Sequence, residues 1–328
     1  SVIKDLGLPS GTVQLIYRTP HDVGEHLVSH PSVGATGYTG SRGAGLVLKK
    51  AADLAGKPIY LELSSINPVV ILPGALEERA DEIAEEFVTS CLLGTGQFCT
   101  NPGLVILQTS SQTNTFVQKL VQQFNSAPVG SLLSKSVEEG MGSAVQNLQS
   151  AGAELLVGGQ PGGGVGFCYQ NTLLQVSGDQ FLSNAEHLQE EAFGNESLLV
   201  LAESSEQICQ ILRHLEGNLT GTIYSAEGGN DDAAYNQLAP ILRRKVGRLL
   251  NDKMPTGVAV SAAMNHGGPY PATAHPGFTA VGIPAAITRF AQLQCFDNIR
   301  ADRLPVELQD ANPLGIWRFV DGKWTNQN

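Results

Sequence analysis

The short stretch GTGQFCT (Gly94–Thr100) places a cysteine where its thiol could do chemistry. A cysteine attacks other molecules as its thiolate, so it needs nearby N–H groups or a base to support the anion. Gly94, Gly96 and Gln97 come just before Cys99 and give its loop unusual backbone freedom. We therefore predict that Cys99 is a nucleophile. We interpret the other cysteines as ordinary packed thiols: Cys91, Cys168, Cys209 and Cys295.

An acidic residue in an apolar stretch is the second candidate. Glu62 lies in YLELSS, between Leu61 and Leu63, in a segment that predicts a strand. Partial burial raises the pKa of a carboxyl group toward the range useful for a general base. We therefore consider Glu62 a candidate base. The alternative is a strand residue that faces solvent.

A glycine-rich turn precedes a predicted helix in YTGSRGAG (residues 38–45). Free N–H groups at a helix start, with glycines that permit close approach, suit a phosphate group. Gly40 and Ser41 are the candidate contacts. The spacing is not G-x-G-x-x-G, so the turn is no dinucleotide fingerprint by itself. The alternative is that Ser41 only caps the helix.

Histidines are the remaining candidates. His26 and His30 stand four residues apart, as metal ligands can on a helix, but no third ligand or H-E-x-x-H pattern accompanies them. We interpret them as a solvated helix face and expect no metal. His266 lies in a long glycine-rich loop, where we expect it to shape the loop or contact a substrate rather than to act in catalysis.

The composition narrows the class of protein. The chain has 328 residues, 42% of them hydrophobic, and a net charge of −11. That length allows more than one domain, and an acidic chain without a Lys/Arg cluster argues against nucleic acid or an anionic membrane as partner. No apolar run approaches the length of a membrane span. Five cysteines at irregular spacing indicate reduced thiols, and so a cytoplasmic location.

Strand and helix patterns alternate along the chain and predict a mainly parallel α/β sheet covered by helices. The helical period is clearest over 77–94, just before the Cys99 loop. Residues after 250 lose periodicity, and a long irregular loop in a compact domain is usually functional. The expected strands are 12–17, 103–108, 154–157, 169–175, 197–203, 219–225 and 246–250, with two short extended pieces in 58–72. The expected helices are 21–30, 42–55, 77–94, 113–126, 136–151, 205–215 and one that ends near 242.

Together these stretches resemble the aldehyde dehydrogenase superfamily. The carriers of the resemblance are LELSSINPVV with Glu62, GQFCTNPG with Cys99, EEAFG (190–194) and YTGSRGAG. PTGVAV, HGGPYPAT and the ending NPLGIWRFVDG are closer to the NADP-type branch. That branch contains α-ketoglutaric semialdehyde (2,5-dioxovalerate) dehydrogenases. The resemblance covers essentially the whole chain.

The chain also departs from the family pattern. Ser64 and Ser65 replace a Gly-Gly pair, and Asn195 replaces a proline. The family's N-terminal segment, with the first half of the cofactor domain and an oxyanion-binding asparagine, has no counterpart. The resemblance therefore implies a fragment with an aldehyde-dehydrogenase-like fold, in which a partial Rossmann-like cofactor domain precedes a complete α/β catalytic domain. The expected domains are 1–62 (cofactor), 63–297 (catalytic) and 298–328 (C-terminal oligomerisation arm).

The resemblance implies oxidation of an aldehyde to an acid with NADP or NAD. Cys99 attacks the carbonyl, and Glu62 later activates the water that hydrolyses the thioester. Glu191 and Phe193 are expected to contact the nicotinamide ribose and ring. Arg18, after the predicted strand 12–17, is a candidate partner for a 2′-phosphate. The expected partners are a small aldehyde and, in the full-length protein, a homodimer or homotetramer.

Two other classes of function stay open. The isolated chain could be a non-catalytic fragment with a structural role in association, and we expect it not to turn over aldehyde by itself. A CoA-acylating dehydrogenase, in which a thiol replaces water, is the second alternative, and the retained Glu62 argues against it.

Overall fold

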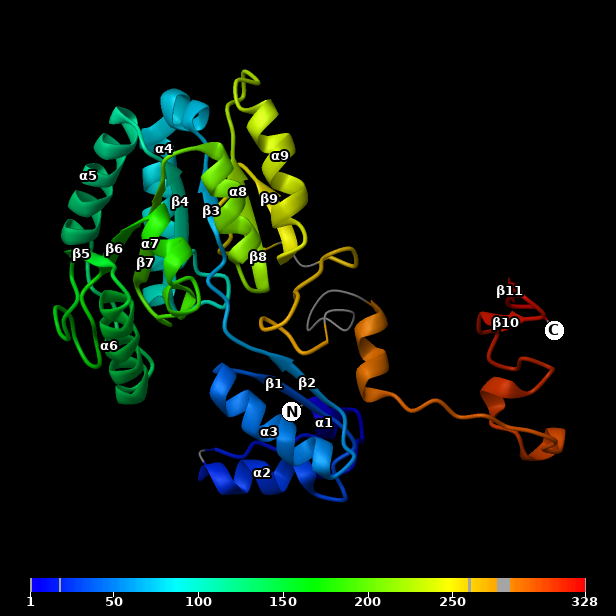
Figure 1. Cartoon of the computed structure of the whole chain (residues 1–328). Helices are drawn as coiled ribbons and strands as arrows, with labels where there is room; N and C mark the ends of the chain where they lie inside the picture. The colour runs from blue at the N-terminus through cyan, green and yellow to red at the C-terminus, as the bar shows by residue number, and fades with distance from the viewer. Residues whose placement is uncertain (1, 18, 259–260, 276–283, 328) are drawn as a thin grey trace. The chain divides into compact units, whose positions relative to one another are not determined.

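The structure is a computed structural model that describes residues 2–17, 19–258, 261–275 and 284–327. It forms two compact units, Ser1–Arg289 and Phe290–Asn328. The first unit contains both the large sheet and a smaller one (Figure 1). The predicted boundary between a cofactor domain and a catalytic domain, between residues 62 and 63, lies within this unit and stays a prediction.

A seven-stranded sheet forms the centre of the first unit, in the order β5-β6-β7-β4-β3-β8-β9. All neighbouring strands are parallel except β5 and β6. The predicted α/β class is confirmed. The strands are β3 (Val69–Ile71), β4 (Leu104–Gln108), β5 (Glu154–Val157), β6 (Thr172–Ser177), β7 (Glu196–Ala202), β8 (Asn218–Tyr224) and β9 (Val246–Asn251).

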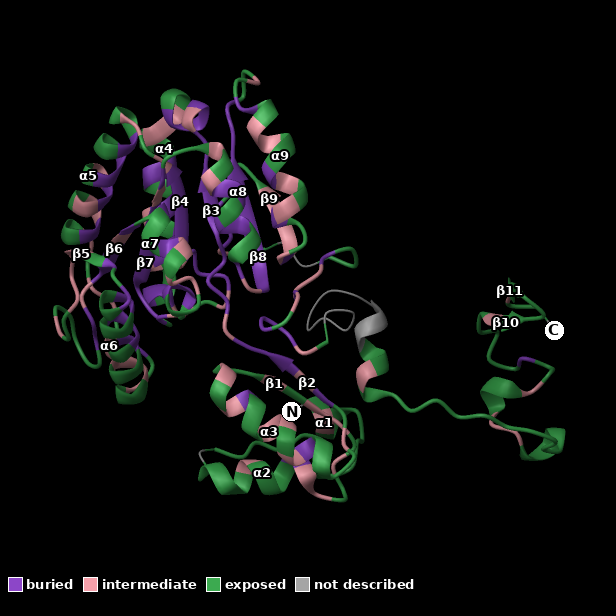
Figure 2. Ribbon diagram, in the orientation of Figure 1, coloured by how far each residue is buried: buried purple, intermediate pink, exposed green. Residues whose placement is uncertain are grey.

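Helices cover both faces of this sheet, which explains why its central strands read as continuous apolar runs. One face packs against α4 (Pro73–Leu92) and α5 (Ser111–Ser126). The other packs against α6 (Lys135–Ser150), α7 (Gly178–Ser183), α8 (Ser205–His214) and α9 (Asp232–Leu242). Figure 2 shows the buried strands between the two helical layers.

The second sheet of this unit is small. Strands β1 (Thr36–Thr39) and β2 (Ile59–Glu62) are parallel, and α3 (Arg42–Leu54) connects them. Helix α2 (His21–Ser29) completes a core of only a few buried side chains: Val28, Ala52, Ile59, Leu61 and Leu63. A short helix, α1 (Val2–Asp5), precedes these elements.

The prediction of a strand at 12–17 is wrong, because residues 12–17 form a bend and irregular backbone. Leu15 is 88% exposed, and residues 12–17 pair with no strand in the part of the chain that the structure describes. A strand gains its stability from pairing and burial, which this stretch lacks. Arg18, the candidate for the 2′-phosphate, lies outside the described residues.

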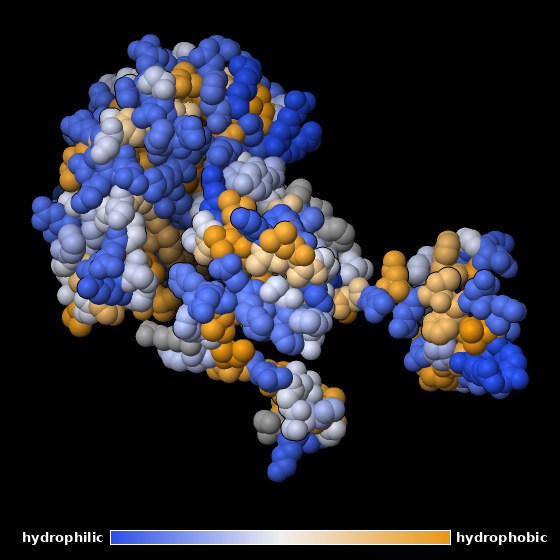
Figure 3. Space-filling view, turned by 60° about the horizontal axis from the view of Figure 1, so that its bottom comes forward, coloured by the Kyte–Doolittle hydropathy of each residue, from blue (hydrophilic) through white to orange (hydrophobic). Residues whose placement is uncertain are grey.

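The second unit, Phe290–Asn328, contains little regular structure. A hairpin of β10 (Arg318–Val320) and β11 (Lys323–Thr325) is its main element. Its aromatic side chains are largely exposed: Trp317, Phe319 and Trp324. Figure 3 shows hydrophobic and hydrophilic residues interspersed over the visible surface of the protein. Among the described residues of the whole chain, no helix is long and apolar enough to cross a membrane.

Candidate active site

The Cys99 loop follows the end of α4 and packs against the EEAFG turn. Gly96 has φ of +68°, a conformation that L side chains rarely adopt. A Cβ at this position would collide with the carbonyl oxygen of Gly194. The glycine therefore permits a close backbone contact, and that contact places Cys99 near the segment that carries Glu191 and Phe193.

Asn67 fixes the Cys99 loop to the large sheet. Its Nδ2 donates to the carbonyl oxygens of Cys99 and Asn101, both at 2.9 Å. Its Oδ1 accepts from Thr220 Oγ1 on β8 at 2.9 Å. Asn67 is fully buried, so these bonds are shielded from water. The backbone N–H of Cys99 donates to none of the described groups and is available to a bound oxyanion.

Glu62 lies at the end of β2 and is 7% exposed. The chain returns to this strand after β9. Leu63 N–H donates to Ala272 O at 2.8 Å, and Ala274 N–H donates to Leu61 O at 3.1 Å. The segment 272–274 thus lies along β2 as an added strand, and it brings the preceding residues of the long loop to the side chain of Glu62.

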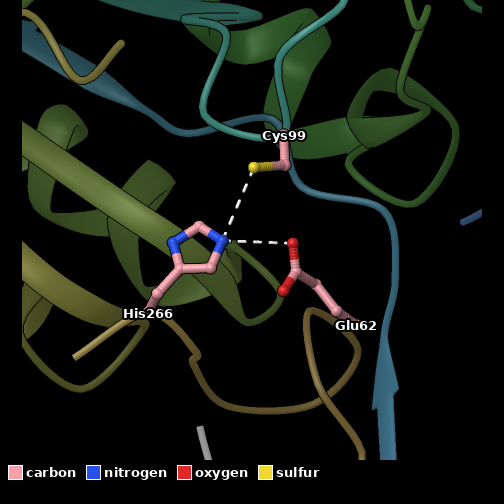
Figure 4. Close-up of side chains that lie close together, drawn as sticks. All are labelled: Glu62, Cys99 and His266. Carbon is pink, nitrogen blue, oxygen red and sulfur yellow. Dashed lines mark hydrogen bonds and ion pairs between the residues drawn. The ribbon is translucent and has the colours of Figure 1, made fainter. Parts of the chain in front are cut away.

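His266 lies in this loop and contacts Glu62. Its Nε2 lies 3.5 Å from Cys99 Sγ and 3.1 Å from Glu62 Oε1, so the imidazole bridges thiol and carboxylate (Figure 4). The segment just after it packs closely on β9, since a Cβ at Gly247 would collide with the carbonyl oxygen of Gly267. The loop therefore lies directly on the end of β9.

The electrostatics of this group favour a charged imidazole. Hydrogen bonds to Cys99 and to Glu62 raise the pKa of His266 to about 10, against the opposing effect of burial. At neutral pH the ring is then an imidazolium held between two groups that accept its proton. The charged ring therefore lies 3.5 Å from Sγ, the atom that would attack a carbonyl carbon.

The structure brings Cys99 and Glu62 together as sequence reasoning expected, and it adds His266. We expected His266 to shape the loop or contact a substrate rather than to take part in catalysis, and its roles as a residue of the site stay proposals. In the sequence, the position of His266 in the glycine-rich loop was the feature that could have indicated a place in the site. Nothing in the spacing of residues 62, 99 and 266 indicates that they meet.

The glycine-rich turn before α3 lies beside the same site. Gly40 N–H donates to Glu62 O at 3.1 Å. Ser41 is the N-cap residue of α3, as the alternative interpretation had it, but its side chain makes no capping hydrogen bond. Arg42 pairs with Glu216, with Nη2 and Oε2 2.5 Å apart. The turn thus offers backbone N–H groups and a free hydroxyl next to Glu62.

Glu191 and Phe193 border the site from the EEAFG turn. Burial raises the pKa of Glu191 to about 7, although hydrogen bonds from Ser65 and Ser64 and the charge of Arg42 oppose this shift. Phe193 is 40% exposed and offers a free aromatic face. Asn195, where the family pattern has proline, is fully buried and donates to Tyr169 O at 2.9 Å. Hydrogen bonding thus satisfies its Nδ2, whereas its Oδ1 is buried without a hydrogen-bond partner among the described residues.

The central three side chains could also hold a metal ion. One ligand atom from each of Glu62, Cys99 and His266 lies within 4.8 Å of the others. Carboxylate, thiolate and imidazole are the ligands that Zn²⁺ prefers, and three of them leave room for a water molecule. The expectation of no metal stays a prediction. His26 and His30 are only edge-to-face neighbours, with ring centroids 5.6 Å apart.

The fold is that of solved aldehyde dehydrogenases. A betaine aldehyde dehydrogenase of Staphylococcus aureus, crystallised with NAD⁺, superposes with a TM-score of 0.69 at 21% identity. The match covers 83% of this chain and 53% of that one. An NAD-dependent aldehyde dehydrogenase of Sinorhizobium meliloti gives a TM-score of 0.67 over 82% of this chain and 52% of its own, also at 21% identity.

The sequence comparisons give the family. The model of the Aldehyde dehydrogenase family matches residues 1–268, and the chain belongs to that family. It is 39% identical to alpha-ketoglutaric semialdehyde dehydrogenase 2 of Azospirillum brasilense and 37% identical to alpha-ketoglutaric semialdehyde dehydrogenase of Acinetobacter baylyi. Each match covers 98% of this chain and 61% of the relative, so the chain spans about three fifths of their length.

Proposed function

We propose that the protein to which this chain belongs oxidises an aldehyde to a carboxylic acid through a covalent adduct on Cys99. The observation that carries the proposal is the contact of His266 with both Cys99 Sγ and Glu62 Oε1. A semialdehyde of an α-keto acid is the favoured substrate, because the two relatives at 39% and 37% identity are named for that activity.

The first step forms a carbon–sulfur bond. The Cys99 thiolate attacks the aldehyde carbon, and the carbonyl electrons move to oxygen. The resulting oxyanion lies where the free backbone N–H of Cys99 can donate to it. The protonated His266 supports the thiolate before attack, and its bond to Glu62 fixes the orientation of the ring.

The residues beside the site fit a nicotinamide dinucleotide. Ser41 and the first N–H groups of α3 would hold a phosphate, with Gly40 allowing close approach. Glu191 would bond the ribose, and the exposed face of Phe193 would contact the ring. When bound, NADP⁺ or NAD⁺ accepts the hydride that leaves the adduct, which makes the adduct a thioester. Arg18 stays the proposed partner of a 2′-phosphate.

The second step releases the acid. Glu62 takes a proton from water, the water oxygen attacks the thioester carbon, and the carbon–sulfur bond breaks to return the thiolate. The burial of Glu62 and its contact with His266, which also contacts Cys99, support this role. Because water is activated here, hydrolysis is favoured over transfer to a second thiol such as CoA.

Several finer points are part of the same proposal. The turnover is assigned to the protein that carries the remaining two fifths of the relatives' length. For this chain alone we propose thiol chemistry at Cys99 without aldehyde turnover, so that a non-catalytic role in association is the alternative. A cytoplasmic location and a homodimer or homotetramer stay predictions.

The test uses the thiols of the chain itself. Cys295 is exposed and Cys99 is partly buried, so exposure alone predicts faster labelling of Cys295. At pH 6 an ordinary thiol is mostly protonated. We expect sub-stoichiometric iodoacetamide at pH 6 to label Cys99 first, as mapped by peptide mass spectrometry. Preferential labelling of Cys295, or of the buried Cys91, would remove the basis of the proposal.

A further inference from the structure

One half-buried cation near the site, Arg248, has no use in the steps above. Arg248 lies on β9, where its register partner on β8 is Thr220. Partners in neighbouring strands project to the same face of a sheet. Thr220 Oγ1 donates to Asn67, and Asn67 in turn donates to the carbonyl oxygen of Cys99. Arg248 therefore projects to the face of the sheet that holds the Cys99 loop.

Two nitrogens of the Arg248 guanidinium group lack partners. Its Nε and Nη2 are shielded from solvent and hydrogen-bond to none of the described residues. Burial lowers the pKa of Arg248, and the negative charge of Cys99 opposes this effect. Shielded donors of a charged group are costly when they lack hydrogen bonds, and a bound anion would offset that cost. An arginine presents a planar fork of donors, which matches a carboxylate.

The carboxylate beside Cys99 is already engaged. Glu62 Oε1 bonds to His266 Nε2 at 3.1 Å. The ion pairs of the described part of the chain join other arginines, among them Arg42 and Arg79, to acidic partners. Arg248 is in none of them. We infer that the negative charge opposite its guanidinium group comes from a bound molecule.

We propose that Arg248 binds the carboxylate at the far end of a substrate whose aldehyde group reacts with Cys99. The proposal rests on the proposed function and deepens it: the preferred substrate is an aldehyde that carries a carboxylate, as an α-keto acid semialdehyde does. Arg248 then selects anionic aldehydes over neutral ones of the same length. Arg248 follows Gly247 on β9, and Gly247 packs against Gly267 in the loop that carries His266.

The experiment measures this selection without turnover. Methanethiosulfonates that carry a carboxylate on one to four methylene groups are compared with their carboxamide counterparts. Each transfers its alkylthio group to a thiolate, so that an S–S bond forms at Cys99 and methanesulfinate leaves. The rate ratio of acid to amide at Cys99 is divided by the same ratio at the exposed Cys295, which reports the reagents' intrinsic difference.

We expect this double ratio to be about tenfold at the best chain length, as a hydrogen bond to a charged group allows. In Arg248→Gln it falls to about one, and Arg248→Lys, which keeps the charge without the fork, is intermediate. The matched control is Arg244→Gln, an exposed arginine four residues away, which makes the same change in net charge and leaves the ratio high.

The outcomes separate the proposals. A double ratio near one in the unaltered chain, or a high ratio that survives in Arg248→Gln, overturns the role of Arg248 and leaves the proposed function standing. Equal slowing of acid and amide in Arg248→Gln would mean that Arg248 supports only the thiolate. If Cys99 reacts with no reagent faster than Cys295 does, the proposed function fails and this inference fails with it.

A second measurement guards against a variant that misfolds. Arg248→Gln removes a shielded, unpartnered charge, so we expect its melting temperature, followed by circular dichroism, to equal or exceed that of the unaltered chain. In addition, 2-oxoglutarate should slow labelling of Cys99 by the carboxamide reagents in the unaltered chain. It should give no such protection in Arg248→Gln, whereas protection that persists there would contradict the proposal.

Discussion

The two regions that meet at Cys99 are built very differently. The nucleophile region (residues 63–258) packs helices on both faces of a seven-stranded sheet and has two extensive cores. The cofactor region (residues 19–62) has two paired strands and a handful of buried side chains. Apolar side chains of α3 remain exposed there, with Leu54 at 82% and Val47 at 50%.

This difference bears on how precisely each catalytic group is held. Cys99 is fixed by buried hydrogen bonds from Asn67 and by the contact between Gly96 and Gly194. Glu62 is held by one added strand and by His266. Few buried contacts mean low local stability, so we expect Glu62 to belong to the part of the chain that opens more readily. We therefore expect the proposed nucleophile, Cys99, to be held more rigidly than the proposed base, Glu62.

The largest expected effect concerns the Cys99 loop, in residues 63–258. In Gly96→Val, a β-branched residue must adopt φ of +68° and its Cβ collides with Gly194. Together these should cost about 3 kcal/mol or more of unfolding free energy. Urea unfolding followed by circular dichroism measures it. A loss below 1 kcal/mol would show that the Cys99 loop is looser than its backbone contact implies.

The next effect is a pH dependence at Glu191, which hydrogen-bonds to Ser64 and Ser65 and senses the charge of Arg42 across the two regions. Because its pKa is raised from 4.5 to about 7, the folded chain binds an extra proton between these pH values. Stability therefore falls as pH rises through this window, by about 3 kcal/mol. Glu191→Gln should flatten the fall in urea-unfolding series at pH 5 and pH 8. An equally steep fall in the variant would assign it to other groups.

A third prediction concerns the contact across the regions. In His266→Gln the thiol loses its cationic neighbour, so alkylation of Cys99 at pH 6 should slow by about tenfold. The deficit should shrink toward pH 9, where a thiol ionises without help. Labelling of Cys295 in the same sample serves as the control. Equal rates at pH 6 in both proteins would mean that His266 has no influence on the thiolate.

Sequence patterns predicted the nucleophile region well, because its strands are buried apolar runs and its helices have clear amphipathic periods. The predicted strand 154–157 and helices 113–126 and 136–151 match β5, α5 and α6 to within two residues. The strand predicted at 12–17 has the same local pattern, but without a partner strand that pattern is not sufficient. Local sequence indicates what a segment prefers, and pairing decides whether the preference is satisfied.

The candidate site divides in the same way. Cys99 and Glu62 were recognisable because each lies in a distinctive local setting, and their proximity is what the family resemblance implied. His266 depends on a return of the chain over about 200 residues, fixed by Gly247 and by the pairing of 272–274 with β2. Arg248 depends on the register of β9 with β8. Such long-range placements are set by packing, which no local pattern encodes.

The smallest expected effect would strengthen the weaker region directly. Gly24 lies inside α2, and a Cβ there would rest 3.5 Å from Leu48 Cδ2 on α3, an ordinary packing distance. Replacing a helical glycine with alanine stabilises by about 1 kcal/mol, and the new contact adds to this. Hydrogen exchange of the α2 and α3 amides should slow by roughly fivefold or more in Gly24→Ala.

The matched control for Gly24→Ala lies in the rigid region. Gly140, inside α6, has nothing within 4 Å of an added Cβ, so Gly140→Ala gains the helix propensity alone. It should slow exchange in α6 and leave α2 and α3 unchanged. If Gly140→Ala slows exchange in α2 and α3 as much as Gly24→Ala does, the two regions open as one unit, and the contrast between a rigid nucleophile and an adjustable base is wrong.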